Sequence, residues 1–184
     1  MSGKKLLILS DTHGDVSLLT VVLNWASERL PPNDTIMAAA FLGDGLSDIG
    51  RAAEKSGFYS EWKIVSGNND YGITVPDTAV FEFAGYKFFM THGDSYNVYS
   101  GYHSVTNAGK KNNANVVLFG HTHVPYYENV NGMLLVNPGS VSRPRSRIGE
   151  SFAVMEFPEN GPPKTEFWGI SEQHEIFLLA LHEE

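Results

Sequence analysis

A chain of 184 residues with no cysteine suits one domain without disulfides, in which any metal site must use nitrogen and oxygen ligands. With 42% hydrophobic and 18% charged residues, it can bury a core and is not a disordered polymer. The net charge of −8 argues against a nucleic-acid or anionic-membrane surface, but bound divalent cations would still allow a phosphorylated substrate.

The chain has no stretch that approaches the ~18 consecutive apolar residues of a membrane span. Its N-terminal apolar run stops at Ser10-Asp11, short of the ~7–15 residues of a secretory signal. We therefore expect a cytoplasmic protein without a membrane partner. Because no linker and no internal repeat divides the sequence, residues 1–184 are expected to form a single domain.

The first half of the chain alternates buried strands with helices. Continuous apolar runs, typical of strands buried on both faces, predict strands at 6–9, 36–42 and 62–65. Asp15 is a candidate N-cap for a helix that Pro31-Pro32 would end, and a shorter helix is expected at 49–55, closing at Gly57. This order of elements predicts a largely parallel, two-sided sheet.

The second half is richer in hairpins. Residues 80–83 and 87–90 flank one turn, while 126–130 and 133–136 flank the turn signal Asn131-Gly132. A helix is expected at 103–111, with further strands at 116–119, 152–157 and 165–169. The tail, 175–182, fits a strand or a short helix equally well. Two mixed sheets packed together with helices outside would fit this order.

Five clusters of metal-ligand residues each follow an apolar, strand-like segment. They are Asp11-Thr12-His13, Gly43-Asp44, Gly67-Asn68-Asn69-Asp70, Thr91-His92-Gly93 and Gly120-His121-Thr122-His123. In an open α/β sheet, ligands bind in the crevice beyond the strand ends. Any one cluster alone could be a capped turn or a core histidine, but all five in this order indicate one metal centre.

The clusters supply more ligands than one metal ion needs. Two ions that share a bridging carboxylate would use them all, and such a pair, ~3.5–4 Å apart, clamps both oxygens of a phosphoryl displacement. It also lowers the pKa of bound water towards ~7, which provides a hydroxide nucleophile. Mixed imidazole and carboxylate ligands favour Mn²⁺, Fe, Co, Ni or Zn over Ca²⁺, and we expect Mn²⁺.

These motifs, in this order, resemble those of the calcineurin-like metallophosphoesterase superfamily. The segment Gly120-His121-Thr122-His123-Val124-Pro125, followed by Asn137-Pro138-Gly139-Ser140-Val141-Ser142, is similar to the small YfcE-type phosphodiesterases of that superfamily. The resemblance covers nearly the whole chain. It implies a four-layer α-β-β-α sandwich with two mixed β-sheets flanked by helices, and a metal-dependent hydrolase that cleaves a small phosphodiester substrate through a metal-bridging hydroxide.

The resemblance also implies a role for each ligand. One metal ion would be held by Asp11, His13 and His123. The second would be held by Asn68, His92 and His121, with Asp44 bridging the two. The same three residues, Asn68, His92 and His121, would lie near the phosphate and act in catalysis.

Two positions depart from the family pattern. Many relatives carry a histidine, which can protonate the leaving group, where this chain has Asn69. Because a positioned proton donor gives typically ~10²–10⁴-fold, a phosphomonoesterase or protein phosphatase is disfavoured against a diesterase with a good leaving group. The YfcE-type proteins often read His-Gly-His where this chain reads His92-Gly93-Asp94, so we expect the pocket rim to differ from theirs in shape and charge. A rival of another class is a non-catalytic scaffold like the small subunit of retromer, but such scaffolds are expected to have eroded ligands.

Several further residues are left with two interpretations. Arg143, Arg145 and Arg147 suit phosphate recognition or a solvated loop. Tyr96, Tyr99, Tyr102 and His103 could stack on a substrate or pack locally. Asp48 and Asp70 would be turn groups or would orient metal-bound histidines. The apolar tail 176–181 could cover a sheet edge or form a homo-oligomer interface.

Overall fold

The computed structural model describes residues 4–29 and 37–181. Pro31, Pro32, Ile36 and His182, on which some expectations fell, lie outside these residues. The strands are β1 (Lys4–Leu9), β2 (Met37–Phe41), β3 (Glu61–Ile64), β4 (Thr78–Phe83), β5 (Tyr86–Thr91), β6 (Val116–Leu118), β7 (Pro125–Val130), β8 (Met133–Pro138), β9 (Glu150–Phe157), β10 (Lys164–Ile170) and β11 (Ile176–Leu179). The helices are α1 (Val16–Arg29), α2 (Leu46–Ser56) and α3 (His103–Lys111), with 3₁₀ turns η1 (Asp94–Tyr96) and η2 (Val98–Ser100).

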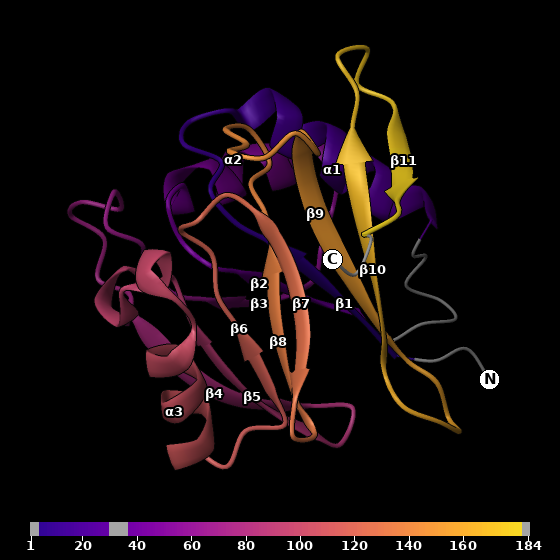
Figure 1. Cartoon of the computed structure of the whole chain (residues 1–184). Helices are drawn as coiled ribbons and strands as arrows, with labels where there is room; N and C mark the ends of the chain where they lie inside the picture. The colour runs from indigo at the N-terminus through magenta and orange to yellow at the C-terminus, as the bar shows by residue number, and fades with distance from the viewer. Residues whose placement is uncertain (1–3, 30–36, 182–184) are drawn as a thin grey trace.

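The strands form two mixed sheets (Figure 1). The six-stranded sheet has the order β11-β10-β9-β1-β2-β3, and the five-stranded sheet has the order β4-β5-β6-β8-β7. Strands β1, β2 and β3 are parallel to one another, and so are β5, β6 and β8. Parallel strands bring their carboxyl ends to the same edge of a sheet, where polar loops can meet.

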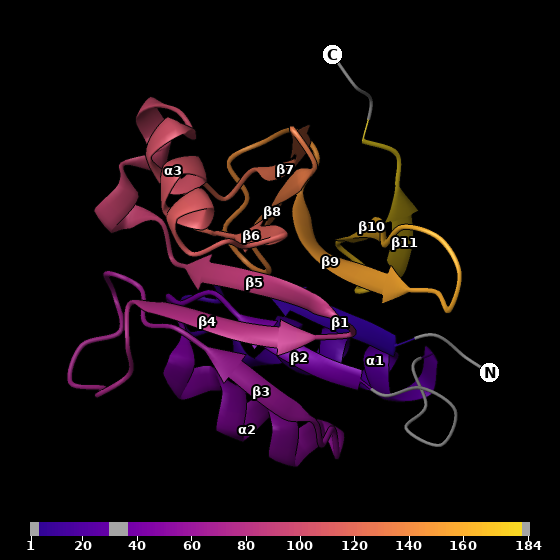
Figure 2. The same ribbon diagram turned by 90° about the horizontal axis from the view of Figure 1, so that it is seen from below.

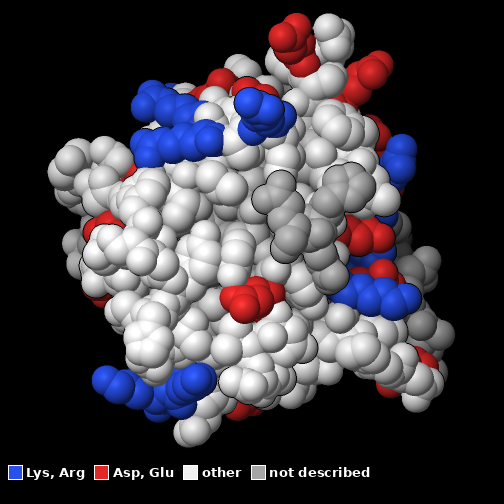
Figure 3. Space-filling view, viewed as in Figure 1, with Lys and Arg blue, Asp and Glu red and all other residues white. Residues whose placement is uncertain are grey.

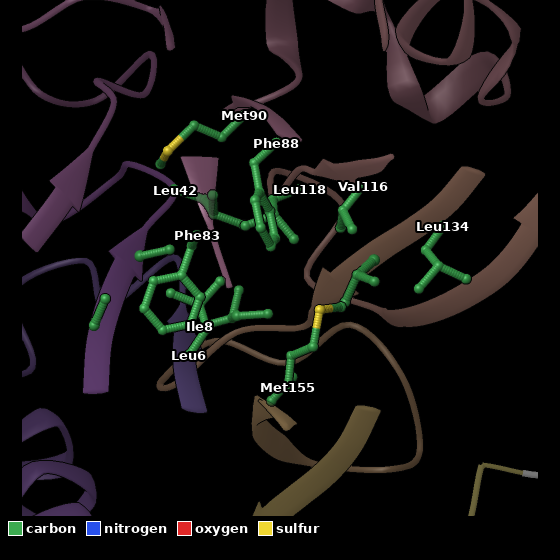
Figure 4. Packing of buried hydrophobic residues seen from close by; sticks show 14 of the residues in the cluster. Leu6, Ile8, Leu42, Phe83, Phe88, Met90, Val116, Leu118, Leu134 and Met155 are labelled. Atoms are coloured by element: carbon green, nitrogen blue, oxygen red, sulfur yellow. The ribbon is translucent and has the colours of Figure 1, made fainter. Parts of the chain in front are cut away.

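Burial on both sides explains the continuous apolar runs in the central strands. Leu6 and Ile8 of β1 point into the core between the sheets (Figure 4), whereas Leu7 and Leu9 pack in the layer that includes buried residues of α1 and α2. This alternation follows the two-residue period of a strand. On the second sheet, Phe89 packs in the cluster that contains buried residues of α3.

The helices cover the two outer faces. Figure 2 shows α1 and α2 on one side of the sheets and α3 on the other. The four-layer α-β-β-α sandwich is therefore confirmed. Within the residues that the structure describes, no helix has the length and apolar character to cross a membrane.

Most expected elements lie where the sequence placed them, and the differences have local causes. Asn131 and Gly132 both have positive φ, 54° and 88°, as a two-residue type I′ hairpin requires. The ambiguous tail forms a strand, β11, which pairs with β10 at the sheet edge. Helix α2 begins earlier than expected, at Leu46, because the distant Asp70 carboxylate accepts the N–H groups of Gly45 and Leu46.

Candidate metal centre

Loops from both sheets meet at one end of the sandwich. The Asp11 N–H donates to the Gly43 carbonyl (3.0 Å), and the Gly120 N–H donates to the His92 carbonyl (2.8 Å). Between the two sheets, the His121 N–H donates to Asp11 Oδ2 (3.2 Å). These backbone bonds fix the strand-end loops against one another before any metal is considered.

The backbone of the proposed ligands is unusual. Left-handed φ values occur at Asp11 (58°), His13 (44°), Asp44 (59°), His121 (68°) and His123 (59°). For a residue other than glycine this conformation costs ~1–2 kcal/mol, and such strain tends to gather at functional sites. The sharp turns let two residues of one short loop aim side chains into the same space.

Asp11, His13 and His123 form the first ligand group. Asp11 Oδ1 lies 3.0 Å from His123 Nε2 and 3.7 Å from His13 Nε2, and the two imidazole Nε2 atoms are 3.2 Å apart. Although fully buried, Asp11 Oδ1 has no donor directed at it within the described part of the chain. The His123 Nδ1–H must donate to the Arg143 carbonyl (2.5 Å), so its Nε2 lone pair is turned towards Asp11 and His13.

His92, His121 and Asp44 form the second group. The His92 Nδ1–H donates to the Leu42 carbonyl (2.7 Å), and its Nε2 lies 3.1 Å from His121 Nδ1. Asp44 Oδ2 is 3.5 Å from His92 Nε2 and 3.7 Å from His13 Nε2. The Asp44 carboxylate therefore lies between the two groups.

This arrangement fits divalent metal ions. Metal-bound histidines typically donate their other ring N–H to a carbonyl or carboxylate, as His92 and His123 do. Imidazole nitrogens ~3 Å apart repel each other unless a cation or a proton lies between them. A buried carboxylate oxygen without a donor carries a similar cost. Both features would be relieved by a cation at the centre of each group.

The pKa shifts describe a pocket that attracts positive charge. Burial would raise the pKa of Asp44, but His92 and Asn69 lower it below its ordinary value. Burial would lower the pKa of His92, yet Asp44 and Asp11 raise it to about 9. Burial lowers the pKa of His13, and burial together with His92 lowers that of His121. The cluster thus keeps the Asp44 carboxylate ionised, and it favours neutral imidazoles with a free nitrogen lone pair at His13 and His121.

Asn68 and Asn69 lie in the loop that follows β3, and both side chains are exposed. No described residue hydrogen-bonds to the Asn68 side chain, so its role as a ligand stays a prediction. Asn69 donates its backbone N–H to Asp44 Oδ1 (2.8 Å) and its Nδ2 to Asp44 Oδ2 (2.6 Å). The structure gathers the other six proposed ligands, which are Asp11, His13, Asp44, His92, His121 and His123.

Two buried or partly buried carboxylates support the ligand loops, as the sequence suggested. Asp70 accepts four backbone N–H groups: those of Asp44 (2.7 Å), Gly67 (2.8 Å), Gly45 (2.9 Å) and Leu46 (2.8 Å). Asp48 accepts the Thr12 hydroxyl (2.6 Å), the Gly14 N–H (2.9 Å) and Arg51 (3.2 Å). These carboxylates hold the loops after β1 and β2 in place.

Polar residues at the end of β8 and directly after it, to which the sequence assigned no role, hold the ligand loops. The Ser140 hydroxyl donates to the Asp11 carbonyl (2.8 Å), and the Ser142 hydroxyl donates to the Thr12 carbonyl (2.7 Å). Asn137 Nδ2 donates to the Gly120 carbonyl (2.9 Å). The sequence signal for these residues is the motif Asn137-Pro138-Gly139-Ser140-Val141-Ser142, which carries the family resemblance but does not reveal these partners.

Of the tyrosines in the segment after His92, one lies at the cluster. The Tyr99 hydroxyl donates to the His121 carbonyl (2.8 Å), the two rings are 4.8 Å apart, and the Arg145 guanidinium lies 5.5 Å from the Tyr99 ring. Tyr96 packs on Phe89, Tyr102 packs on Phe119 and Tyr126, and His103 contacts Asn107. Local contacts therefore account for the other two tyrosines and for His103.

Comparisons with known proteins agree with this geometry. The model of the calcineurin-like phosphoesterase superfamily domain matches residues 5–160. A probable metallophosphoesterase of Bacillus subtilis, YsnB, is 27% identical over 163 residues, which cover 88% of this chain and 89% of that protein. The chain therefore belongs to the calcineurin-like phosphoesterase superfamily.

Solved structures show the same fold. A predicted phosphoesterase from Streptococcus pneumoniae superposes with a TM-score of 0.75 at 26% identity, covering 96% of this chain and 94% of that one. Vps29 from Cryptosporidium parvum gives 0.73 at 17%, covering 97% of each chain. The phosphoesterase Yfce from E. coli gives 0.63 at 20%, covering 97% of this chain and 100% of its own. At 17% and 20% identity, the similarity to Vps29 and to Yfce shows a common fold and nothing further.

Proposed function

We propose that this phosphoesterase is a dinuclear phosphodiesterase whose single domain spans residues 1–184. The observation that carries the proposal is the position of Asp44. Its Oδ2 lies 3.5 Å from His92 Nε2 and 3.7 Å from His13 Nε2, so one carboxylate adjoins both ligand groups. A carboxylate shared in this way is what a pair of metal ions requires.

In this proposal Asp11, His13 and His123 hold one ion, and His92 and His121 hold the other with Asp44 shared. Bound ions of this kind lower the pKa of water and polarise the phosphoryl group; Mn²⁺ is our expectation, with Fe, Co, Ni or Zn as alternatives. Asn68 would complete the second group by turning its exposed side chain inward. His121 and His92 would then lie beside the phosphate.

The residue at position 69 bears on the substrate. The backbone N–H and the side-chain Nδ2 of Asn69 both donate to Asp44, so Asn69 orients the Asp44 carboxylate. Its amide has no titratable proton to give to a leaving group. General acid catalysis is typically worth ~10²–10⁴-fold. The proposal therefore favours diesters with good leaving groups over monoesters and alkoxide leaving groups.

The test is hydrolysis of bis-p-nitrophenyl phosphate by metal-stripped protein, with and without added Mn²⁺. We expect Mn²⁺-dependent turnover that Asp44→Asn abolishes and that Asp77→Asn, an exposed aspartate elsewhere, retains. Turnover of p-nitrophenyl phosphate at an equal or higher rate would replace the diesterase with a monoesterase. Bound metal without turnover of either ester would favour a non-catalytic scaffold, and failure to bind metal would refute the centre itself.

A further inference from the structure

A groove of about 450 Å³ opens beside the metal centre, with His13 on its wall. Its other lining residues come from the loop before α1 and the first turn of that helix, from α2 and from the loop that joins β8 to β9. Because a proposed ligand forms part of the wall, a group attached to a phosphate at the centre can extend directly into this groove.

Two arginines line the groove, and one of them has no partner. The Arg143 guanidinium makes no ion pair or hydrogen bond with any residue that the structure describes. Its backbone is nevertheless fixed, because its N–H donates to the Ser140 hydroxyl (2.8 Å) and its carbonyl accepts the His123 Nδ1–H (2.5 Å). An unpaired cation is thus anchored at the edge of the metal centre.

The second arginine, Arg51, is held by one contact. Its Nη2 donates to Asp48 Oδ1 (3.2 Å), and a guanidinium has five N–H donors, so most of them stay available. The one acidic group of the lining, Asp15, accepts the Leu18 N–H at Oδ1 (2.9 Å) and sets a single negative charge against the two guanidinium groups. The side chains that face the groove therefore offer more donors than acceptors.

The chain as a whole carries a net charge of −8. Figure 3 shows Lys and Arg side chains in several separate places on this face, including its upper edge, where acidic side chains lie beside them. Guanidinium groups bind phosphate through charge-assisted hydrogen bonds. A phosphate monoester has three terminal oxygens and a charge of about −1.5 to −2 at pH 7, so it can accept from both arginines and neutralise more of their charge than a carboxylate can.

We propose that the groove lined by Arg51 and Arg143 is a subsite for a second phosphate group on the substrate. This inference rests on the proposed function and narrows it to phosphodiesters in which one esterified group carries a further phosphate. Arg51 and Arg143 are in this view specificity-determining residues, since they bind a part of the substrate that takes no part in bond cleavage.

Calorimetric binding to the full-length, Mn²⁺-loaded protein tests the subsite without turnover. The probes are thymidine 5′-monophosphate, thymidine 5′-diphosphate and thymidine 3′,5′-bisphosphate. We expect at least one of the two probes with a second phosphate to bind about tenfold more tightly than the monophosphate, as one charge-assisted contact would give. The ratio should fall to about twofold or less in Arg143→Gln and in Arg51→Gln.

Arg147→Gln is the matched control, because this exposed arginine lies in the same loop but does not line the groove. It should keep the full ratio. The subsite is overturned if the parent protein binds all three probes equally, or if both groove variants keep the ratio while their melting temperatures show that they fold. Hydrolysis of bis-p-nitrophenyl phosphate by the same preparation separates the two claims. Turnover without a binding preference refutes the subsite alone, and a preference without turnover refutes the diesterase alone.

Discussion

Replacing Asp70 with asparagine should weaken the loops that carry the metal ligands. The Asp70 carboxylate accepts four backbone N–H groups at 2.7 to 2.9 Å, two at each oxygen. Asparagine keeps one oxygen, so two N–H groups would lose their acceptor and face an amide N–H₂ instead. The two N–H groups that lose their acceptor would be either those of Asp44 and Gly67 or those of Gly45 and Leu46, at the start of α2.

The size of the effect follows from these contacts. A hydrogen bond to a charged group contributes ~1.5–3 kcal/mol, and two are removed. Asp70 is partly exposed, so water compensates in part, and we expect Asp70→Asn to lower the free energy of unfolding by about 3 kcal/mol. For a chain of this size that corresponds to a fall of roughly 6–12 °C in melting temperature.

Urea denaturation of metal-free protein measures this change directly. The midpoint should fall while the slope stays constant, since the surface exposed on unfolding is unchanged. Asp77→Asn makes the same chemical change at an exposed site and should have little effect. A loss below about 1 kcal/mol for Asp70→Asn, or one equal to that of the control, would refute the supporting role of this carboxylate.

Two further predictions concern packing and pH. In α3, a Cβ at Gly109 would lie 2.4 Å from Val117 Cγ2, whereas one at Gly50 in α2 meets nothing within 4 Å. Gly109→Ala should therefore cost about 1–3 kcal/mol and Gly50→Ala should gain about 0.5–1 kcal/mol in urea denaturation; equal effects would contradict the packing of α3. Because the pKa of His92 rises from 6.5 to about 9 on folding, its contribution to the stability of metal-free protein is complete below pH 6.5 and is lost as the pH rises through 9. Thermal melts should show this loss in the parent and in the exposed control His103→Gln, but not in His92→Gln; parallel curves for all three would argue against it.

The sequence predicted the parts of the site that depend on strand order. Buried apolar runs identify strands that end in ligands. Parallel strands that share an edge bring Asp11 near Asp44 in one sheet and His92 near His121 in the other, and the packing of the two sheets joins the two pairs. The expected sandwich followed from the same pattern together with the family resemblance. Local turn chemistry, as at Asn131-Gly132, was equally readable.

What the sequence did not reveal depends on contacts between residues far apart in the chain. The start of α2 is set by Asp70, more than twenty positions away. The position of Asn69 against Asp44 and that of Ser140 against the Asp11 carbonyl likewise depend on tertiary structure. A motif names the residue types at a site, but it does not say which of two adjacent asparagines hydrogen-bonds to Asp44.

The division of the ligands between the two halves of the chain has a consequence for synthesis. Asp11, His13 and Asp44 follow strands of the six-stranded sheet, while His92, His121 and His123 follow strands of the five-stranded sheet. A nascent chain that has folded only its first three strands offers carboxylates and a single imidazole, which is too few donors for a tight transition-metal site. The full set of six gathered ligands is therefore present only after His123, the last of them in the chain, has left the ribosome.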